Sequence, residues 1–559
     1  MAATEPAGSD SQPDPGATRH RRGLKAAGLV LAVVLCVLVV LVVAVGTIAP
    51  GTSSRGSRPT PHVGRAGVVA PWVVAENSLR GTTAWQIPRS ARIGGIEGFA
   101  DENYVATGQR VGLYVSTTAS HYRVVAYRMG YYQGRGAREV WSSGTLRGRV
   151  QPRCPTTPGI NMTSCANWSR ALRVTITSAF VQGDYLFKLT GNGGQQAYVP
   201  LTVWAPASSA TYLVMNRTFV EEGWNAFGGY DFYQGKGACA PGASVYPVCN
   251  RARVVSFDRP YDTGNGASDF FGDEYPLIRF CEEHGLDVTY VTDVTVTEHP
   301  GIVARHRVLL SLGHDESWSY QERVGVQQAE KKGVNIVFFG AASVLRHVRL
   351  QASPLGRDRQ EVDYRDPSED PLTARGGSPM EITGNTWSSP PSSWPGDPLV
   401  GETYSGYLRA GTAPAPFVVA DARSWIYRGT HLHNGSVLPS VIASDIDHVA
   451  QFQGAPADLM VLGHSPIPLS EVYTNQGTWG ANTYSDMTYY TDPDSGAGVI
   501  DTGNNNWINA MTACPSHGGC AAGELQLITG NILRLFGLGP AGRRMPSRSN
   551  LASIRPAGS

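Results

Sequence analysis

The stretch RHRVLLSLGHDES, residues 305–317, decides the fold that the sequence predicts. Its run VLLSL and the later run NIVFF, residues 335–339, are almost continuously apolar. Such short runs are typical of strands covered on both faces, as in a parallel sheet with crossover helices. Residues 320–332 between them are expected to form a helix, which Ser319 and Glu322 begin as a capping box. The stretch therefore predicts an α/β domain.

The alternation of strand-like and helix-like segments extends over residues 207–540, which we assign to an α/β domain with a mainly parallel sheet. It begins with the predicted strand TYLVMN, residues 211–216, and residues 269–284 are expected to form one helix. Residues 351–454 are rich in Pro, Gly and Trp and have few periodic elements, which predicts an irregular or β-rich insertion. The last segment, residues 541–559, is predicted to be a disordered tail.

A different pattern precedes this domain. Residues 71–206 contain short segments that alternate with period two between turn signals, such as QRVGLYVST at residues 109–117. Short strands at this spacing predict an all-β, immunoglobulin-like sandwich. The cluster YRMGYYQGRGARE, residues 127–139, is unusual for the end of a strand, and we consider it a candidate surface for docking the following domain.

The N-terminal segment predicts the compartment. Residues 26–49 carry no charge and would rise about 36 Å as a helix, more than the roughly 30 Å of a bilayer core. We expect a single transmembrane helix acting as a signal-anchor; a cleaved signal peptide, the alternative, has a shorter apolar region. Basic residues before the helix place residues 1–25 in the cytoplasm, and residues 50–70 read as a flexible linker. The predicted protein is a single-pass cell-membrane protein with extracytoplasmic domains.

The spacing of the cysteines agrees with that placement. Six of them form three close pairs in loops, which indicates short-range disulfides in an oxidising compartment. Zinc is the alternative, but it needs four convergent ligands and the chain has no C-x2-C pair. Cys281, in a predicted helix, is expected to be a buried and inert thiol. The predicted disulfides are Cys154–Cys165, Cys239–Cys249 and Cys514–Cys520.

Charge and missing motifs exclude several functions. With 46 basic and 45 acidic side chains, and no basic run beyond the N-terminal tail, nucleic acid is not an expected partner. The chain has no G-x-S-x-G elbow, no Walker loop and no G-x-G-x-x-G after a strand. These absences argue against the common serine hydrolase, P-loop and dinucleotide chemistries.

The strongest candidate site follows the strand VLLSL, because ligands of open α/β sheets bind outside the carboxyl ends of strands. There His314 and Glu316 stand two residues apart on a tight turn, and the capping box leaves both without a structural duty. A second cluster includes Tyr230 and Tyr233, whose phenolates are hard oxygen donors suited to ferric iron. The amide-rich loop at residues 503–507 either lines the same crevice or forms simple turns.

Several unusual motifs occur in one order along the chain: ENSLRGTTAW, GIEGFAD, YRMGYYQGRGAREV, LLSLGHDESWS and VNIVFFGA. In these the chain resembles proteins built like the large (beta) subunit of N,N-dimethylformamidase. The resemblance implies an iron-dependent amidohydrolase for non-peptide C–N bonds, in which a mononuclear ferric ion held by two tyrosines and a glutamate activates water. It also implies a histidine and an asparagine near the metal.

Carried over position by position, the resemblance places the glutamate on Glu316, the histidine on His314 and one tyrosine on Tyr230, with Tyr233 as the nearby alternative. Two positions depart from the family pattern. Trp224 stands at the other tyrosine position and Ala342 at the asparagine position. Indole cannot ligate iron.

Two functions from different classes are therefore expected. The first is a metal-dependent amide hydrolase of unknown substrate, with Fe(III) held by Glu316 and Tyr230, and with His314 moving protons. The alternative is a catalytically inactive cell-surface binding or structural protein, which the changes at Trp224 and Ala342 favour. The expected partners are the lipid bilayer and an unknown small molecule or cell-surface ligand. An oligomer or a second subunit is a further expectation, which the two-subunit family suggests.

Overall fold

A computed structural model of the chain describes residues 62–91, 94–237, 249–450, 454–474, 480–512, 514 and 520–554. All of them belong to one compact unit, residues 60–559. The predicted cytoplasmic tail and transmembrane helix, residues 1–25 and 26–49, lie outside the described residues. Across the described ranges, no helix is long and apolar enough to span a bilayer. The structure does not support the single N-terminal transmembrane helix that the predicted fold had as its first element.

The first part of the described chain contains two sheets packed face to face. The smaller sheet has the strand order β11-β5-β3, and the larger has the order β4-β13-β12-β6-β7, with β8 paired to β6. Inward-facing residues of both sheets, such as Val111 and Leu113 of β5 and Phe187 of β12, form one buried cluster. The strands are β3 Ile96–Ala100, β4 Tyr104–Ala106, β5 Arg110–Thr117, β6 His121–Met129, β7 Ala137–Ser142, β8 Leu146–Arg147, β11 Leu172–Thr175, β12 Gly183–Gly191 and β13 Gln196–Trp204.

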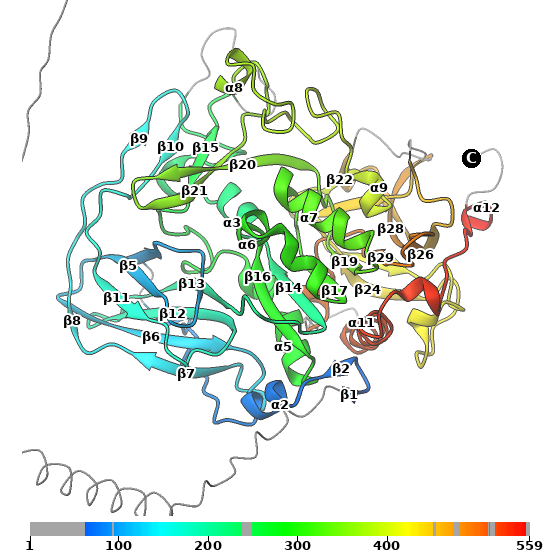
Figure 1. Cartoon of the computed structure of the whole chain (residues 1–559), viewed down its shortest axis with the longest axis horizontal. Helices are drawn as coiled ribbons and strands as arrows, with labels where there is room; N and C mark the ends of the chain where they lie inside the picture. Colours follow the sequence, from blue (N-terminus) through cyan, green and yellow to red (C-terminus); the bar gives the residue numbers. More distant parts are fainter. Residues whose placement is uncertain are drawn as a thin grey trace, which may run out of the picture. The chain divides into compact units, whose positions relative to one another are not determined.

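A seven-stranded sheet follows, with the order β16-β14-β17-β19-β29-β28-β26 (Figure 1). The pairs from β16 to β29 are parallel, and β28 and β26 add an antiparallel edge, so the sheet is mixed. The predicted strands VLLSL and NIVFF are confirmed as β17 and β19. The strands are β14 Tyr212–Asn216, β16 Val288–Thr292, β17 Val308–Leu312, β19 Asn335–Phe339, β26 Met460–Pro468, β28 Asn482–Thr491 and β29 Gly498–Asp501.

Helices cover both faces of this sheet. Leu310 and Val337 pack with residues of α5 (Tyr275–Glu283) and α11 (Ala522–Phe536) in one cluster. Their strand neighbours Leu309 and Ile336 pack with residues of α6 (Asp293–Glu298) and α7 (Tyr320–Glu330) in another. The alternation follows from the period of two of a strand, and burial on both faces explains why VLLSL and NIVFF lack polar alternation.

Two sequence expectations about helices have different outcomes. The capping box of α7 is confirmed, because the Glu322 amide donates to Ser319 Oγ at 3.1 Å and the Glu322 carboxylate accepts from the Ser319 amide at 3.3 Å. The single helix over residues 269–284 is wrong. It divides into α4 (Phe270–Asp273) and α5 at Glu274, whose φ of −126° is not helical, directly before the turn that holds Pro276. Proline lacks the amide that would continue the ladder.

The region predicted to be an irregular insertion contains strands of three small sheets. The order β15-β21-β20-β18 joins it to the turn after β17, β25-β22-β27 forms the second sheet, and β23-β24 the third. Within the predicted tail, η4 (Ala541–Arg543) and α12 (Leu551–Ile554) are helical. The strands are β15 Val254–Ser256, β18 Ser317–Ser319, β20 Arg346–Ser353, β21 Gly356–Val362, β22 Thr403–Leu408, β23 Ala415–Val418, β24 Val437–Ile442, β25 Asp445–His448 and β27 Val472–Tyr473.

Short elements complete the described chain. They are β1 His62–Val63, β2 Val68–Val69, α2 Pro71–Asn77, β9 Thr156–Thr157, β10 Met162–Thr163, α3 Thr218–Gly223, η1 Phe227–Gly229, η2 Pro300–Arg305, α8 Pro371–Ala374, α9 Asp397–Val400, η3 Trp425–Tyr427 and α10 Trp507–Ala510.

Two of the predicted disulfides are present. Cys154 is bonded to Cys165 and Cys514 to Cys520. Cys249 is also disulfide-bonded, while its predicted partner Cys239 lies outside the described residues. Cys281 is a free, fully buried thiol in α5, as expected, and burial raises its pKa well above the usual range. A thiol that stays protonated is inert.

Candidate functional site

The turn at the carboxyl end of β17 is fixed by glycine. Gly313 has a φ of 54°, in the left-handed region. A Cβ at this position would lie 2.8 Å from the Cβ of Asp273, and a Cβ at Gly340, after β19, would lie 1.8 Å from the Gly313 carbonyl oxygen. The two adjacent turns therefore pack backbone against backbone. This packing holds His314 and Glu316, 8% and 3% exposed, at the carboxyl edge of the sheet.

The turn lines a cavity of about 1190 Å³. This volume is slightly larger than the roughly 300–1,000 Å³ that is common for small-molecule sites. Side chains from distant parts of the chain reach it, mainly at the ends of β20, β22 and β25 and in the loop after β29. The polar and aromatic residues of the lining include Trp224, Tyr233, His314, Glu316, Arg346, Arg365, Tyr404, Tyr407, Asp445, Tyr473, Asn505 and Asn506.

Glu316 is surrounded by hydrogen-bond donors and cations. Its Oε1 accepts from the hydroxyl of Tyr233 and, at 3.2 Å, from Nε1 of Trp224. Its Oε2 lies 3.4 Å from Nε of Arg346 and 3.7 Å from Nε2 of His314. Burial alone would raise the pKa of Glu316, but the positive charges of His314 and Arg346 outweigh it and hold the pKa well below its usual range. The carboxylate is therefore ionised.

His314 also lies close to a second carboxylate, that of Asp445. Its Nε2 is buried without a hydrogen-bond partner and lies 3.8 Å from Oδ2 of Asp445. Burial would lower the pKa of His314, but the negative charges of Asp445 and Glu316 outweigh it and raise the pKa to about 9. The imidazole is therefore a cation at neutral pH. At 3.7 and 3.8 Å from the two carboxylate oxygens, Nε2 lies within ion-pair distance of both.

Of the two candidate tyrosines, the structure brings Tyr233 to this centre. Tyr230 does not line the cavity; it packs against a buried cluster around Phe232. Trp224 lies where the family resemblance places a tyrosine, stacked on Tyr233 at 3.6 Å between ring centroids. Burial, and then the negative charge of Glu316, raise the pKa of Tyr233 well above its usual range, so the phenol keeps its proton.

The asparagine that the family pattern expects after β19 is absent, but another amide lies in the cavity. Ala342 is buried, and its amide donates to Asp447. Asn505, in the amide-rich loop, accepts from the Ala341 amide at 2.7 Å through Oδ1 and donates to Oδ2 of Asp445 at 3.0 Å. The loop that the sequence left open between a simple turn and a cavity wall therefore lines the cavity.

The residues of this centre do not fit a ferric ion. Hard oxygen donors would come from Glu316 and Tyr233, but the third position is Trp224, which has an N–H and no lone pair to offer. The guanidinium of Arg346 stands beside the remaining carboxylate oxygen. Throughout the part of the chain that the structure describes, no group of three or more His, Cys, Asp or Glu side chains is placed to hold a metal.

Three residues of the centre were not predicted from the sequence. Asp445 and Arg346 begin β25 and β20, and Arg365 follows β21, with its guanidinium 4.2 Å from the centre of the Tyr233 ring. All three come from the segment after β19, whose short strands have no periodicity long enough to detect. Arg346 had one local signal, since it follows the buried run NIVFFGAAS, at the same edge of the sheet as His314.

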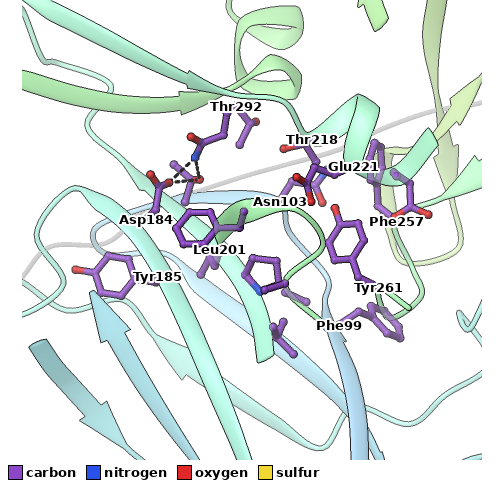
Figure 2. A pocket seen from close by; sticks show the side chains of 18 of the residues that line it. Phe99, Asn103, Asp184, Tyr185, Leu201, Thr218, Glu221, Phe257, Tyr261 and Thr292 are labelled. Atoms are coloured by element: carbon purple, nitrogen blue, oxygen red, sulfur yellow. Dashed lines mark hydrogen bonds between the residues drawn. The ribbon is translucent and has the colours of Figure 1, made fainter. Parts of the chain in front are cut away.

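A second, smaller cavity of about 80 Å³ lies between the sandwich and the seven-stranded sheet (Figure 2). Asp184 of β12 and Asn216 of β14 face each other in it, and the Asn216 amide donates to Asp184 Oδ1 at 2.5 Å. Burial raises the pKa of Asp184 to about 6 and that of Glu222 to about 7. The volume has room for only a few water molecules, so this cavity is a polar domain interface.

Comparisons with known proteins place the chain in a family. A search of curated proteins finds no match. Among solved structures, a cycloisomaltooligosaccharide glucanotransferase of Paenibacillus sp., complexed with cycloisomaltoheptaose, has 10% sequence identity and a TM-score of 0.14. The match covers 50% of this chain and 35% of that one, and we draw no conclusion from so low a score. The family described as "N,N-dimethylformamidase beta subunit-like, C-terminal" matches residues 123–520, well over half of the chain. The chain belongs to the N,N-dimethylformamidase beta subunit-like family.

Proposed function

We propose that this chain hydrolyses a C–N bond of a small amide at the turn formed by residues 313–316. The observation that carries the proposal is the position of Nε2 of His314, which is buried, unpartnered, and 3.7 and 3.8 Å from the carboxylates of Glu316 and Asp445. An acid and two carboxylates meet there on the wall of a large cavity. The family match, which includes this turn, supports a hydrolase-like protein.

The proposed reaction assigns one proton to each side chain. The carboxylate of Asp445 accepts a proton from a water in the cavity, and the water oxygen bonds to the amide carbon. Nε2 of His314 then gives its proton to the nitrogen as the C–N bond breaks, which leaves a carboxylic acid and an amine. The proton on Asp445 then returns to His314, which restores both groups. In this proposal the positive charges of His314 and Arg346, which line the same cavity, stabilise the negative charge that develops on the carbonyl oxygen.

The cavity supports a substrate larger than a simple formamide. Tyr407 and Tyr473 are 47% and 49% exposed and belong to the cavity lining. Their rings lie 5.1 Å apart on paired positions of β22 and β27. Exposed aromatic rings in a cavity bind planar or apolar groups. We therefore propose an amide that carries an aromatic or other extended substituent.

The test is release of amine from a panel of N-substituted formamides and acetamides by the full-length protein. His314→Gln is expected to lower the rate about 10²–10⁴-fold, the usual contribution of a general acid–base group. His433→Gln, at an exposed position remote from the cavity lining, is the matched control and should keep full activity. The proposal fails if the wild-type protein releases no amine from any member of the panel, or if His314→Gln is as active as wild type.

Trp224 favours a second candidate function, a binding protein without catalytic activity. Its indole is 45% exposed, lines the cavity and donates its N–H to the carboxylate of Glu316. A stacked Trp224–Tyr233 pair is a platform for a flat ligand. Binding without turnover of the same amides, measured as a thermal shift that is lost in Trp224→Ala, would favour this role.

We also propose that the domains work in an oxidising compartment. The two disulfides between described cysteines, Cys154–Cys165 and Cys514–Cys520, support this location, because such bonds are rare in reducing cytosol. Retention of both bonds in protein isolated from its native compartment, measured by mass spectrometry after thiol blocking, tests it. Free thiols at these positions would contradict it.

A further inference from the structure

We infer that Arg346 occupies the electrostatic place of a metal ion beside Glu316, so that the centre of this chain is a carboxylate neutralised by a side-chain cation. This inference concerns how the centre is held together, and it does not depend on the hydrolysis proposed above. It rests on the contacts of Glu316, on the way the backbone fixes Arg346, and on the state of Tyr233.

The contacts of Glu316 leave no face open to a cation. Oε1 receives the O–H of Tyr233 and the N–H of Trp224. Oε2 faces Arg346 and His314 at 3.4 and 3.7 Å. All four neighbours present hydrogens or positive charge to the carboxylate, whereas a metal needs lone pairs that point to one empty position. The donor arrangement of Glu316 is that of an ion pair.

Arg346 is held in this position by backbone and side-chain contacts. Its amide donates to the carbonyl of Glu316 at 2.7 Å, and β18 and β20 pair in parallel from Ser317 and Arg346 onward. Its Nη1 donates at 3.0 Å to both the carbonyl and the side chain of Asn385. The guanidinium is therefore a fixed part of the centre, and a metal beside Glu316 would meet its charge at close range.

Tyr233 acts as a hydrogen-bond donor to Glu316 and not as a metal ligand. Its hydroxyl donates to Glu316, and one face of its ring is covered by Trp224 while the guanidinium of Arg365 lies 4.2 Å from the ring centre. A ferric site requires the phenolate, which is a good ligand only after the proton has left. The negative charge of Glu316 is already balanced by the positive charges of His314 and Arg346. A metal ion would therefore add a positive charge that Glu316 does not need for neutrality.

The experiment loads the full-length protein with ferric iron and measures the iron retained per chain and the visible absorption of an iron–phenolate complex. Wild type is expected to stay colourless and to retain no stoichiometric iron. The double variant Trp224→Tyr/Arg346→Gln replaces the indole by a phenol and removes the guanidinium. It is expected to bind one iron per chain and to become coloured, and adding Tyr233→Phe should remove the colour.

The matched control is Trp224→Tyr/Arg357→Gln, which removes an exposed arginine of β21 and keeps Arg346. It is expected to bind no iron. Stoichiometric iron with a phenolate band in wild type would overturn the inference, and this result can be read even if the double variant does not fold. Equal iron binding by the two double variants, or none by a folded Arg346→Gln double variant, would also overturn it, because Arg346 would then not be the group that excludes the metal.

Discussion

The Arg128–Glu282 ion pair makes the contact between the sandwich and the seven-stranded sheet testable. Arg128 of β6 lies in the Arg- and Tyr-rich cluster that the sequence marked as a candidate docking surface, and Glu282 belongs to α5. Nη2 of Arg128 donates to Oε1 of Glu282 at 2.6 Å and Nη1 to Oε2 at 3.1 Å. Both side chains are fully buried, at 0% exposure. Arg128→Leu therefore leaves the Glu282 carboxylate buried without its cation.

Removing one partner of a buried ion pair costs about 3–5 kcal/mol, because the remaining charge stays desolvated. Residues 60–559 form one compact unit, and unfolding entropy is about 2.1 cal/mol/K per residue, or roughly 1 kcal/mol/K for the whole unit. The expected fall in Tm is therefore about 3–5 °C. The double variant Arg128→Leu/Glu282→Leu removes both charges and should recover much of this loss, because an apolar replacement of the pair is often nearly neutral.

Differential scanning calorimetry of wild type, both single variants and the double variant measures the coupling. Arg123→Leu, an exposed arginine on the same strand, is the control, and its stability should change by less than about 0.5 kcal/mol. The reasoning is refuted if Arg128→Leu melts within about one degree of wild type, or if the double variant loses as much stability as the two single variants together.

Three further predictions concern stability and the turn. Burial raises the folded-state pKa of Asp184 to about 6, above an unfolded value of about 3.9, so the folded state binds the extra proton and stability should fall as pH rises from about 4 to about 6. The plot of Tm against pH should be flatter in this window for Asp184→Asn, and an unchanged slope would contradict the assignment. Replacing Cys154 and Cys165 by serine removes a disulfide with a sequence separation of 11, which should cost about 2–3 kcal/mol in urea unfolding. Reduction of the wild type, which also breaks the Cys514–Cys520 bond, should cost at least as much. Gly340→Ala places a Cβ against the Gly313 carbonyl, so amine release should fall at least about tenfold, the effect of a misplaced catalytic group; normal activity would show that the two turns do not need their close approach.

The sequence predicted what depends on local pattern. Continuous apolar runs identified β17 and β19, and the capping box identified the start of α7. His314 and Glu316 lie on the cavity wall because a turn at the carboxyl end of a parallel strand faces the crevice. These inferences need no knowledge of distant parts of the chain.

Other features depend on contacts between distant residues, which no local pattern contains. Asp445 and Arg346 reach the centre through β25 and β20, short strands whose pairing is set by tertiary structure. Tyr230 and Tyr233 are equivalent as donors in sequence, and both pack against the cluster around Phe232, but only Tyr233 lines the cavity and donates to Glu316. The predicted single helix over residues 269–284 divides because Pro276 overrides the apolar periodicity.

The most direct test of the central claim, hydrolysis with His314 as the acid and Asp445 as the base, is to incubate an amide substrate with the full-length protein in isotopically labelled water. Mass spectrometry should then find one labelled oxygen in the carboxylate product and an equal amount of free amine. His314→Gln should form both products about 10²–10⁴-fold more slowly, while His433→Gln should match wild type. Label and amine at equal rates in His314→Gln and wild type would contradict the account.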